Sequence, residues 1–251
     1  MPQRQLRIAT FNIHKGVTSF NARLVLQEQR ELIRKLHADI VFLQEVRGAH
    51  AWHERRFAAW PAESQHEFLA DAIWSDFAYG RNAVYPAGHH GNAILSKYPI
   101  TRSENIDISA HRIEQRGMLH CTMEIPGWDC ELHCICVHLG LLARWRRGQL
   151  AALRDRILSL IPPQAPLVIA GDFNDWHGRA GQVLTEVMHL REVFETTGGR
   201  HARSFPSVLP LFRLDRIYTR GFRVQHAEVH GGAAFARVSD HAALSATLTR
   251  C

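Results

Sequence analysis

The stretch that decides the fold is Pro166–Trp176, PLVIAGDFNDW. Its apolar run, Leu167–Ala170, is short and bounded by proline and glycine, which predicts a strand buried on both faces. Asp172 and Asn174 follow Gly171 and lie on the same side of an extended chain. Asp172 is able to accept a proton from water or bind a metal ion, and Asn174 is able to donate to a phosphate oxygen. A simple turn after a strand has the same composition, so this stretch alone leaves both interpretations open.

Other predicted strands also stop at polar residues. These are Asn12 after RIATF, Glu45 after DIVFLQ, His138 after CICV, Asp215 beside LDRIY, and Asp240 with His241 before AALSATL. One such residue at the end of an apolar strand is ordinary. Repetition at several strands favours a shared site for phosphate chemistry with a divalent metal ion.

Hydrophobic periodicity predicts many strands and a few covering helices. The expected strands are Leu6–Ile13, Asp39–Val46 (stopping at Gln44 and Glu45), Phe77–Tyr85, Asn92–Ser96, Ile106–Ile108, Gly117–Ile125, Cys130–Val137, Leu214–Tyr218, Phe222–Val229 and Ala242–Leu248. The expected helices run from a cap at Asn21 to about His37, and over Ser64–Trp74, Arg144–Leu160 and Gly181–Met188. The longest expected loops are Arg47–Glu63, with a short helical turn, Ala87–Gly91 and Gly198–Pro210. We expect one α/β (α+β) domain over residues 1–251 with stacked sheets.

Composition is that of a soluble globular protein, with 251 residues, 46% hydrophobic and 22% charged. No apolar run reaches the roughly 18 residues of a membrane span, and the start, MPQRQLRIATFN, lacks the apolar core of a secretory signal. The five cysteines form no recognisable disulfide framework. Cys134, Cys136 and His138 share one side of a strand, which leaves zinc as a minor alternative to ordinary packing. We expect a cytoplasmic monomer.

Positive charge is in excess. The net charge is +6 at pH 7, and all but three of the 30 basic residues are arginines. Arginine binds phosphate through two parallel hydrogen bonds, so anionic partners are favoured, whether nucleic acid or lipid headgroups. A coding bias toward arginine explains the composition equally well. Charge alone does not choose a substrate.

The remaining motifs narrow the chemistry. The chain contains no GxSxG elbow, no GxxxxGK[ST] loop and no GxGxxG loop, which argues against a serine hydrolase and against a nucleotide cofactor. Carboxylate and amide oxygens are the ligands that Mg²⁺ or Mn²⁺ prefers. Imidazoles and an aspartate beside such an ion suit phosphoryl transfer to water.

A family resemblance follows from seven motifs in order. TFNIHKG, DIVFLQEV, GNAILSKYP, VHLG, IAGDFND, LDRIY and SDHAALSA together resemble the endonuclease/exonuclease/phosphatase superfamily, which includes deoxyribonuclease I, inositol polyphosphate 5-phosphatases and neutral sphingomyelinases. They extend from Asn12 to His241, and their exact form is similar to that of a group of uncharacterised bacterial members. The resemblance implies a four-layer αββα sandwich of the DNase I-like type, with the site at one edge of the two sheets.

The resemblance also implies a metal centre. Glu45 would be the principal Mg²⁺ ligand, with Mn²⁺ as a substitute, and Asn12 and Asp240 would lie near the ion. The chain departs from many members at His14, where they carry an acid, so the number of metal ions stays open. The roles of His89 and His90 stay open as well.

Further roles follow for the catalytic groups. Asp172 would orient or deprotonate the attacking water, and His241, aligned by Asp215, would stabilise the phosphate or protonate the leaving oxygen. This is in-line displacement, in which donors and a metal ion neutralise the charge that develops on phosphate. The expected phosphate-binding residues are Asn174, His138, Arg116 and Asn92.

Two substrates stay open. A nuclease acting on DNA or RNA is slightly favoured by the positive charge. The alternative is a phospholipid or inositol-phosphate phosphodiesterase or phosphatase in peripheral contact with a membrane, because Leu141, Leu142, Trp145 and the arginines beside them could lie on lipid. A solvated basic helix face with a core tryptophan explains the same cluster. A binding protein with a degenerate site is disfavoured, since a competent residue fills each chemical position.

Overall fold

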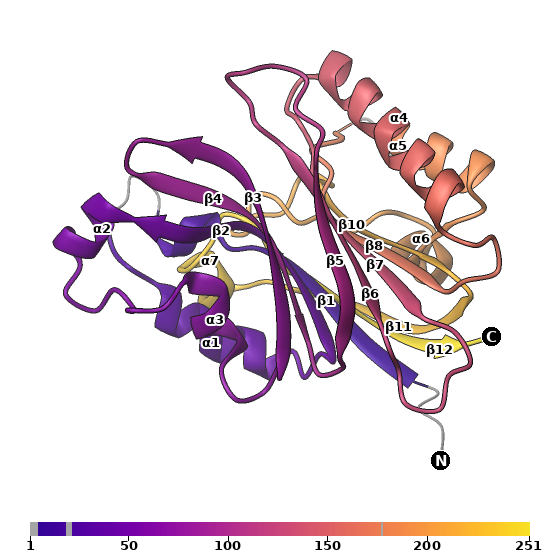
Figure 1. The fold of residues 1–251 in the computed structure, drawn as a ribbon, viewed down its shortest axis with the longest axis horizontal. Coiled ribbons are helices and arrows are strands. Elements are labelled where there is room, and N and C mark those ends of the chain that lie inside the picture. Colours follow the sequence, from indigo (N-terminus) through magenta and orange to yellow (C-terminus); the bar gives the residue numbers. More distant parts are fainter. Residues whose placement is uncertain (1–4, 19–21, 177) are drawn as a thin grey trace.

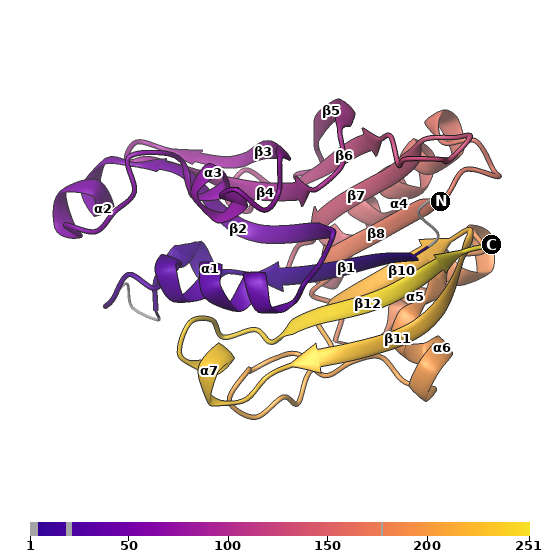
Figure 2. The same ribbon diagram turned by 90° about the horizontal axis from the view of Figure 1, so that it is seen from below.

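Two six-stranded sheets pack face to face, and helices cover their outer surfaces (Figure 1). The computed structural model describes residues 5–18, 22–176 and 178–251. The view from below separates the two sheets, with β1, β2, β11 and β12 in one and β7, β8 and β10 in the other (Figure 2). This is the predicted four-layer αββα arrangement, so the expected fold class is confirmed.

The first sheet has the order β11-β12-β1-β2-β4-β3. Its strands β1 and β2 run parallel, and its other neighbouring strands are antiparallel. The bounds are β1 Gln5–Asn12, β2 Ile40–His50, β3 Asp76–Tyr85, β4 Gly88–Ser96, β11 Phe222–His230 and β12 Ala243–Arg250.

The second sheet has the order β5-β6-β7-β8-β10-β9. Here β7 and β8 are the parallel pair, and the other neighbours are antiparallel. The bounds are β5 Ile100–Asp107, β6 Gly117–Met123, β7 Leu132–His138, β8 Leu167–Asp172, β9 Arg191–Glu192 and β10 Asp215–Arg220.

The helices bury their apolar sides against the outer faces of the sheets. Helices α1, α3 and α7 pack on the first sheet, and α4 packs on the second. The bounds are α1 Leu26–Lys35, α2 Ala51–Arg56, α3 Gln65–Ala70, α4 Ala143–Leu160, α5 Arg179–Gln182, α6 Val193–Gly198 and α7 Ala233–Ala236, with a 3₁₀ turn η1 at His14–Gly16 and a π turn η3 at Val183–Val187. The cap predicted at Asn21 lies outside the described residues.

Residue parity on the strands assigns each side chain to a layer. On β8, Val168 and Ala170 point into the core between the sheets, whereas Leu167 and Ile169 point toward α4. The same alternation holds on β1, where Ile8 faces the other sheet. Both sheets therefore share one central core, since side chains alternate faces along a strand.

Three local predictions are wrong. Strand β2 does not stop at Glu45 but continues to His50 through a bulge. The expected Ala87–Gly91 loop is largely strand β4, because glycine at position 91 lets the chain approach the Gly80 carbonyl, which an added Cβ would meet at 1.8 Å. Helix α6 was not predicted, since its N-cap is the side chain of Glu192, a residue type outside the usual capping set.

Candidate active site

Strand ends from both sheets meet at one edge of the sandwich. Asp172, the last residue of β8, pairs in register with His138 of the parallel strand β7 and with Asp215 of the antiparallel strand β10. Each of these side chains continues the parity of the residues that face the central core, such as Ala170. The polar groups therefore project from the end of the core toward the opposite sheet.

Asn12 reaches this group from the first sheet. It ends β1 on the core-facing side, and its Nδ2 donates to Asp172 Oδ2 at 3.2 Å. Its carbonyl oxygen accepts from Ser239 Oγ at 2.6 Å, and the same hydroxyl accepts from the backbone N–H of His241 at 3.1 Å. One hydrogen-bonded chain thus fixes residues from both sheets.

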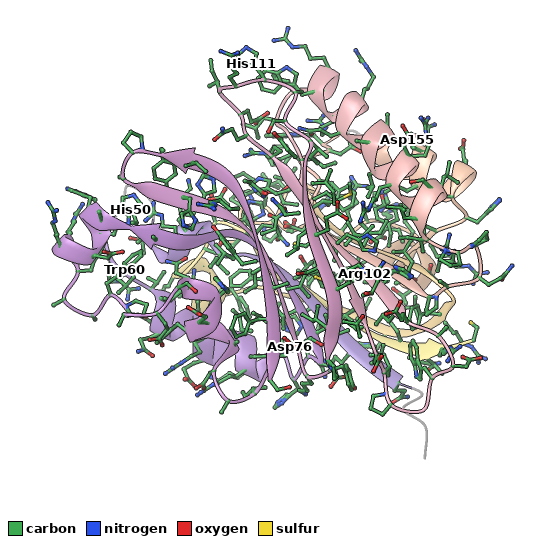
Figure 3. All side chains as sticks on the ribbon, in the orientation of Figure 1. His50, Trp60, Asp76, Arg102, His111 and Asp155 are labelled. Carbon is green, nitrogen blue, oxygen red and sulfur yellow. The ribbon has the colours of Figure 1, made fainter. Side chains whose placement is uncertain are left out.

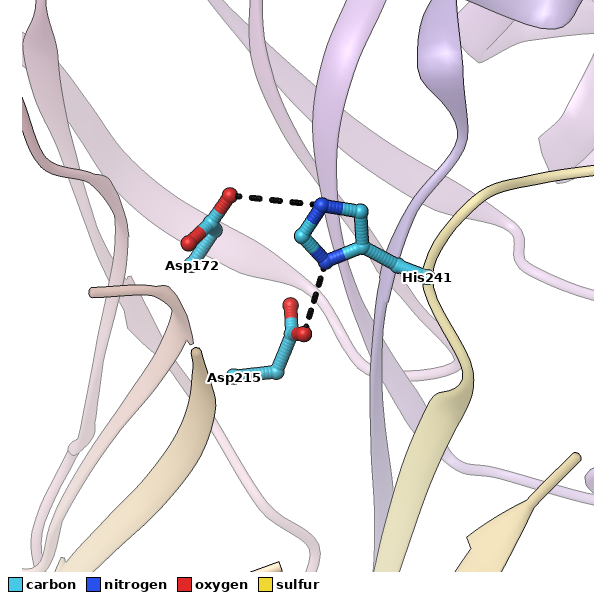
Figure 4. Close-up of side chains that lie close together, drawn as sticks. All are labelled: Asp172, Asp215 and His241. Carbon is cyan, nitrogen blue, oxygen red and sulfur yellow. Dashed lines mark hydrogen bonds and ion pairs between the residues drawn. The ribbon is translucent and has the colours of Figure 1, made fainter. Parts of the chain in front are cut away.

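His241 lies between two carboxylates (Figure 4). Its Nδ1 is 2.8 Å from Asp215 Oδ2, and its Nε2 is 3.8 Å from Asp172 Oδ2. Burial opposes protonation of the imidazole, but the charges of Asp215 and Asp172 and the hydrogen bond to Asp215 raise the pKa of His241 to about 10. A protonated His241 is therefore held ready to donate a proton from Nε2.

Asp172 is the carboxylate on which the nitrogen donors converge. Its Oδ1 accepts from the backbone N–H of Asn174 at 2.9 Å, and its Oδ2 faces Asn12 and also His138 Nε2, 3.5 Å away. Burial raises the pKa of Asp172 to about 6, despite the opposing effect of the His241 charge. A carboxyl group that titrates near neutral pH suits a general base.

Three of the predicted phosphate-binding residues, His138, Arg116 and Asn174, lie together on this side of the site. Burial and the positive charge of Arg116 hold the pKa of His138 well below its ordinary value, so its imidazole is neutral. Arg116 Nε donates to the Leu139 carbonyl at 3.2 Å, and one of its terminal nitrogens lies 3.2 Å from Glu114 Oε1. Asn174 Nδ2 also donates to the Leu139 carbonyl, at 2.9 Å. These contacts place Arg116 and Asn174 beside His138.

Glu45 enters the site through the bulge in β2. Strand parity would aim it at the outer face, but the register shifts between Leu43 and Val46, and Glu45 has a φ of 58°. Burial alone would raise the pKa of its carboxyl group, yet the Lys15 ammonium, 3.3 Å from Oε2, and the nearby His14 imidazole lower it. Glu45 is therefore an ionised, largely buried carboxylate.

The predicted metal ligands suit a hard cation. Glu45 Oε2 is buried and faces the Lys15 ammonium at 3.3 Å, so a metal ion bound there would share this oxygen with Lys15 or displace it. Asp240 Oδ1 lies 3.0 Å from His14 Nδ1, so one predicted metal ligand is already paired with an imidazole. The oxygen donors Glu45, Asp240 and Asn12 match Mg²⁺ or Mn²⁺ better than softer metals. Asp172, Asp215 and His241 also approach within 4.8 Å of one another, so a second ion has candidate ligands.

Asn92 lies at this edge but has its donors engaged elsewhere. Its Nδ2 donates to the carbonyl oxygens of Gly117 at 3.0 Å and Cys136 at 3.3 Å, which joins the two sheets. No uncommitted N–H remains at Asn92 for a phosphate oxygen. We therefore leave Asn92 out of the proposed phosphate site.

The minor zinc alternative finds little support. Cys134 and Cys136 lie in the core between the sheets, and burial raises the pKa of both thiols, to about 12 for Cys136. Zinc binding requires the thiolate form. The sulfur of Cys136 accepts a hydrogen bond from Gln44 Nε2 at 3.3 Å, which is a packing role.

Two groups at the site were not singled out from the sequence. Lys15 pairs with Glu45, and Ser239 accepts from the backbone N–H of His241. His90, whose role the sequence left open, lies close enough to Glu45 for the carboxylate charge to act on its imidazole. Lys15 and Ser239 stand in the motifs TFNIHKG and SDHAALSA, so their proximity to Asn12 and His241 was the available signal. Burial lowers the pKa of His90 to about 4, and the nearby Lys15 and Arg116 charges favour the neutral form further.

Comparison with known proteins assigns the family. The model of the Endonuclease/Exonuclease/phosphatase family matches residues 9–241, so the chain belongs to that family. It is 48% identical over 246 residues to the uncharacterized protein YbhP of Escherichia coli (strain K12), covering 98% of this chain and 97% of that protein. Members of the family hydrolyse phosphoester bonds.

Solved structures share the fold at low sequence identity. Danio rerio TDP2 complexed with a single-strand DNA product has a TM-score of 0.71 at 21% identity, covering 98% of this chain and 99% of that chain. The mannosyl-6-phosphatase Bt3783 of Bacteroides thetaiotaomicron has a TM-score of 0.74 at 16% identity, covering 97% and 99%. In the described residues of our protein, no helix has both the length and the apolarity to cross a bilayer.

Proposed function

We propose that this protein is a divalent-metal-dependent phosphodiesterase that transfers a phosphoryl group to water. The observation that carries the proposal is the Asp172–His241–Asp215 arrangement, in which a base with a pKa near neutral faces a protonated imidazole. A base and an acid with pKa values pushed apart are the pair that hydrolysis of an ester requires.

Glu45, Asn12 and Asp240 would hold the ion. When bound, a Mg²⁺ or Mn²⁺ ion supplies positive charge to the phosphate oxygens and so stabilises the charge that develops during displacement. Glu45 is ionised at neutral pH and already faces one cation, the Lys15 ammonium, which supports its assignment as principal ligand.

The chain's own groups account for the proton transfers. Asp172 accepts a proton from the attacking water as the water oxygen bonds to phosphorus, and the hydrogen bond from the Asn174 backbone holds the carboxylate in position. The bond to the leaving oxygen breaks on the opposite side, and His241 Nε2 gives its proton to that oxygen. Asp215 keeps the imidazole oriented and charged through Nδ1. Neutral His138, Arg116 and Asn174 line the side on which the phosphate oxygens would lie.

The site's geometry supports hydrolysis of a phosphoester but does not choose between nucleic acid and lipid substrates. Positive charge suits nucleic acid and anionic lipid alike, and the two structural neighbours with named functions differ in what they act on or bind. At such low sequence identity, the similarity to those neighbours supports a shared fold but not a shared substrate.

The first test is hydrolysis by purified protein with Mg²⁺, with Mn²⁺ or with EDTA. Substrates are abasic-site and supercoiled DNA, phospholipid vesicles, phosphoinositides and a soluble nitrophenyl phosphodiester. We expect Asp172→Asn and His241→Ala each to lower turnover by about 10³-fold or more, because each removes a proton-transfer partner. EDTA should abolish activity with every substrate.

Matched control variants separate chemistry from folding. One control is Asp155→Asn, because Asp155 lies on the outer side of α4 (Figure 3). The other is His226→Ala, which removes an exposed imidazole of β11. Both should keep the parent rate. A parent-like rate in Asp172→Asn or His241→Ala, with circular dichroism unchanged, would refute the role given to that residue.

A further inference from the structure

Exposed hydrophobic side chains gather along one flank of the candidate site. They come from the loops before β6, after β7, after β8 and before β10, and each is between 39% and 88% exposed. We call them the apolar rim: Ile113, Leu141, Leu142, Trp176, Val208, Leu209, Leu211 and Phe212. Exposed apolar side chains that gather on neighbouring loops favour an interaction site, because on ordinary surface they are scattered singly.

Contacts between neighbouring loops connect the rim segments. The Trp176 and Phe212 rings pack edge to face with centroids 4.8 Å apart. Arg146 donates to the Leu141 carbonyl at 2.6 Å and lies 4.0 Å from Asp175 Oδ1, next to Trp176 in the chain. The Leu141 backbone N–H donates to Glu114 Oε1 at 3.0 Å, beside Ile113. The four loops therefore form a continuous flank.

The same rim adjoins the catalytic groups. Phe205, which pairs with Phe212, has its ring centroid 5.0 Å from that of His241. A cavity of about 230 Å³ has Val208, the predicted metal ligand Asp240 and its partner His14 in its wall. A partner seated on the rim would thus lie against the mouth of the site.

Backbone hydrogen bonds hold the rim segment around Val208 and Leu209 in a defined turn. The Leu209 N–H donates to the Pro206 carbonyl at 3.1 Å, and the Leu211 N–H donates to the Phe205 carbonyl at 2.9 Å. Val208 and Leu209 at its tip are 79% and 65% exposed. Aliphatic residues held outward at a loop tip leave apolar area in water that only an apolar partner would cover.

Charge around the rim is positive. Arg112, Arg144, Arg147 and Arg203 are exposed in the same segments. The carboxylates there are engaged, since Glu114 lies 3.2 Å from Arg116 and Asp175 is buried beside Arg216. His111 lies at the outer end of this flank (Figure 3). Its ring stacks on that of Trp145 at the start of α4, with centroids 5.7 Å apart. Apolar side chains flanked by arginines complement an anionic amphiphile.

We propose that the apolar rim docks on an anionic lipid bilayer and so brings the catalytic edge to the headgroup phosphodiesters. This inference rests on the proposed function for its chemistry, while the docking itself stands on the rim. Aliphatic side chains enter the acyl boundary, and arginines bind anionic headgroups. A single-stranded nucleic acid would instead call for a row of aromatic rings on which bases stack, whereas the rim is mainly aliphatic.

Partition of the full chain onto vesicles tests the docking. The protein is sedimented with vesicles of phosphatidylcholine alone and of phosphatidylcholine with phosphatidylglycerol. We expect binding to the anionic vesicles, reduced by added salt because the arginine contacts are screened. The double variant Leu209→Ser/Leu211→Ser should bind these vesicles at least about tenfold more weakly, because neither serine side chain gains free energy by entering the lipid.

The matched control is Leu158→Ser/Leu160→Ser. These leucines are 64% and 54% exposed at the other end of α4, about 23 to 26 Å along that helix from its start, and their loss should leave partition unchanged. Parent protein that stays in the supernatant with all vesicles would overturn the proposal. An equal loss in the control variant would overturn it too, as would rim-dependent binding to a single-stranded oligonucleotide without vesicle binding.

These experiments test membrane docking and phosphoester hydrolysis independently. Partition is measured without turnover, so bound vesicles with no hydrolysis of any phosphoester would contradict the proposed function and support docking. Metal-dependent cleavage of soluble diester or DNA, with no partition onto vesicles, would support the chemistry and contradict docking.

Discussion

Two histidines of the same site differ in charge: His241 is protonated and His138 is neutral. Burial disfavours the charged form of both rings, but His241 faces Asp215 and Asp172, whereas His138 faces Arg116 and the charge on His241. The carboxylates raise the pKa of His241, and the cations lower that of His138 further. Neighbours thus divide one residue type into a proton donor and a neutral hydrogen-bonding group.

At this scale we predict that Asp215→Asn moves the alkaline limb of the pH–rate profile to lower pH. His241 must be protonated to donate, so activity falls as pH rises through its pKa, which Asp215 and Asp172 together raise to about 10. Removing that negative charge lowers the pKa, and activity is then lost earlier. The measurement is kcat/KM against pH, with Asp155→Asn as control. An alkaline limb at the parent position would contradict the role of Asp215.

The element that sets the site is the parallel pair β7 and β8. Their register places His138 opposite Asp172. Gly171, just before Asp172, has a φ of 147°, and an added Cβ would come within 2.0 Å of the Val137 carbonyl oxygen. Only glycine fits this close approach between the two strands.

We therefore expect Gly171→Ala to lower the free energy of unfolding by about 2–4 kcal/mol, through backbone strain and the contact with Val137. Gly148→Ala is the matched control, since Gly148 lies in α4 with no atom within 4 Å of an added Cβ. That substitution should stabilise the protein by about 0.5–1 kcal/mol. Urea unfolding measures both, and equal effects at the two glycines would rule out the close-approach argument.

At the scale of the whole molecule, both sheets build one core and one site. Phe42 and Ile94 of the first sheet pack with Val168 and Ile217 of the second, and Asn12 bonds to Asp172 across the same boundary. Neither sheet can bury its inner face alone. The expectation of a single domain over residues 1–251 stays a prediction that unfolding can test.

We predict that the chain unfolds in a single cooperative transition. Tryptophan fluorescence and far-ultraviolet circular dichroism should give the same urea midpoint. Phe42→Ala, fully buried between the sheets, should cost about 3–5 kcal/mol and keep the two midpoints coincident. Phe77→Ala, whose side chain is 38% exposed, should cost less. Two separated transitions would show that the sheets unfold independently.

The sequence by itself determined the family resemblance, the strands and the polar residues at their ends. A buried strand followed by a polar residue is a local pattern, so Asp172 and His138 could be located from neighbouring letters. The structure places eight of the candidates, Asn12, Glu45, His138, Asp172, Asn174, Asp215, Asp240 and His241, at one edge of the sandwich, while their catalytic roles stay proposals.

Only the tertiary structure decided how those groups are aimed, paired and charged. The bulge that turns Glu45 into the site, the pairing of Asp240 with His14, and the engaged donors of Asn92 depend on strands far apart in the chain. The apolar rim likewise joins four separate loops. Such features arise from register, burial and charge at a distance, which no local pattern of residues encodes.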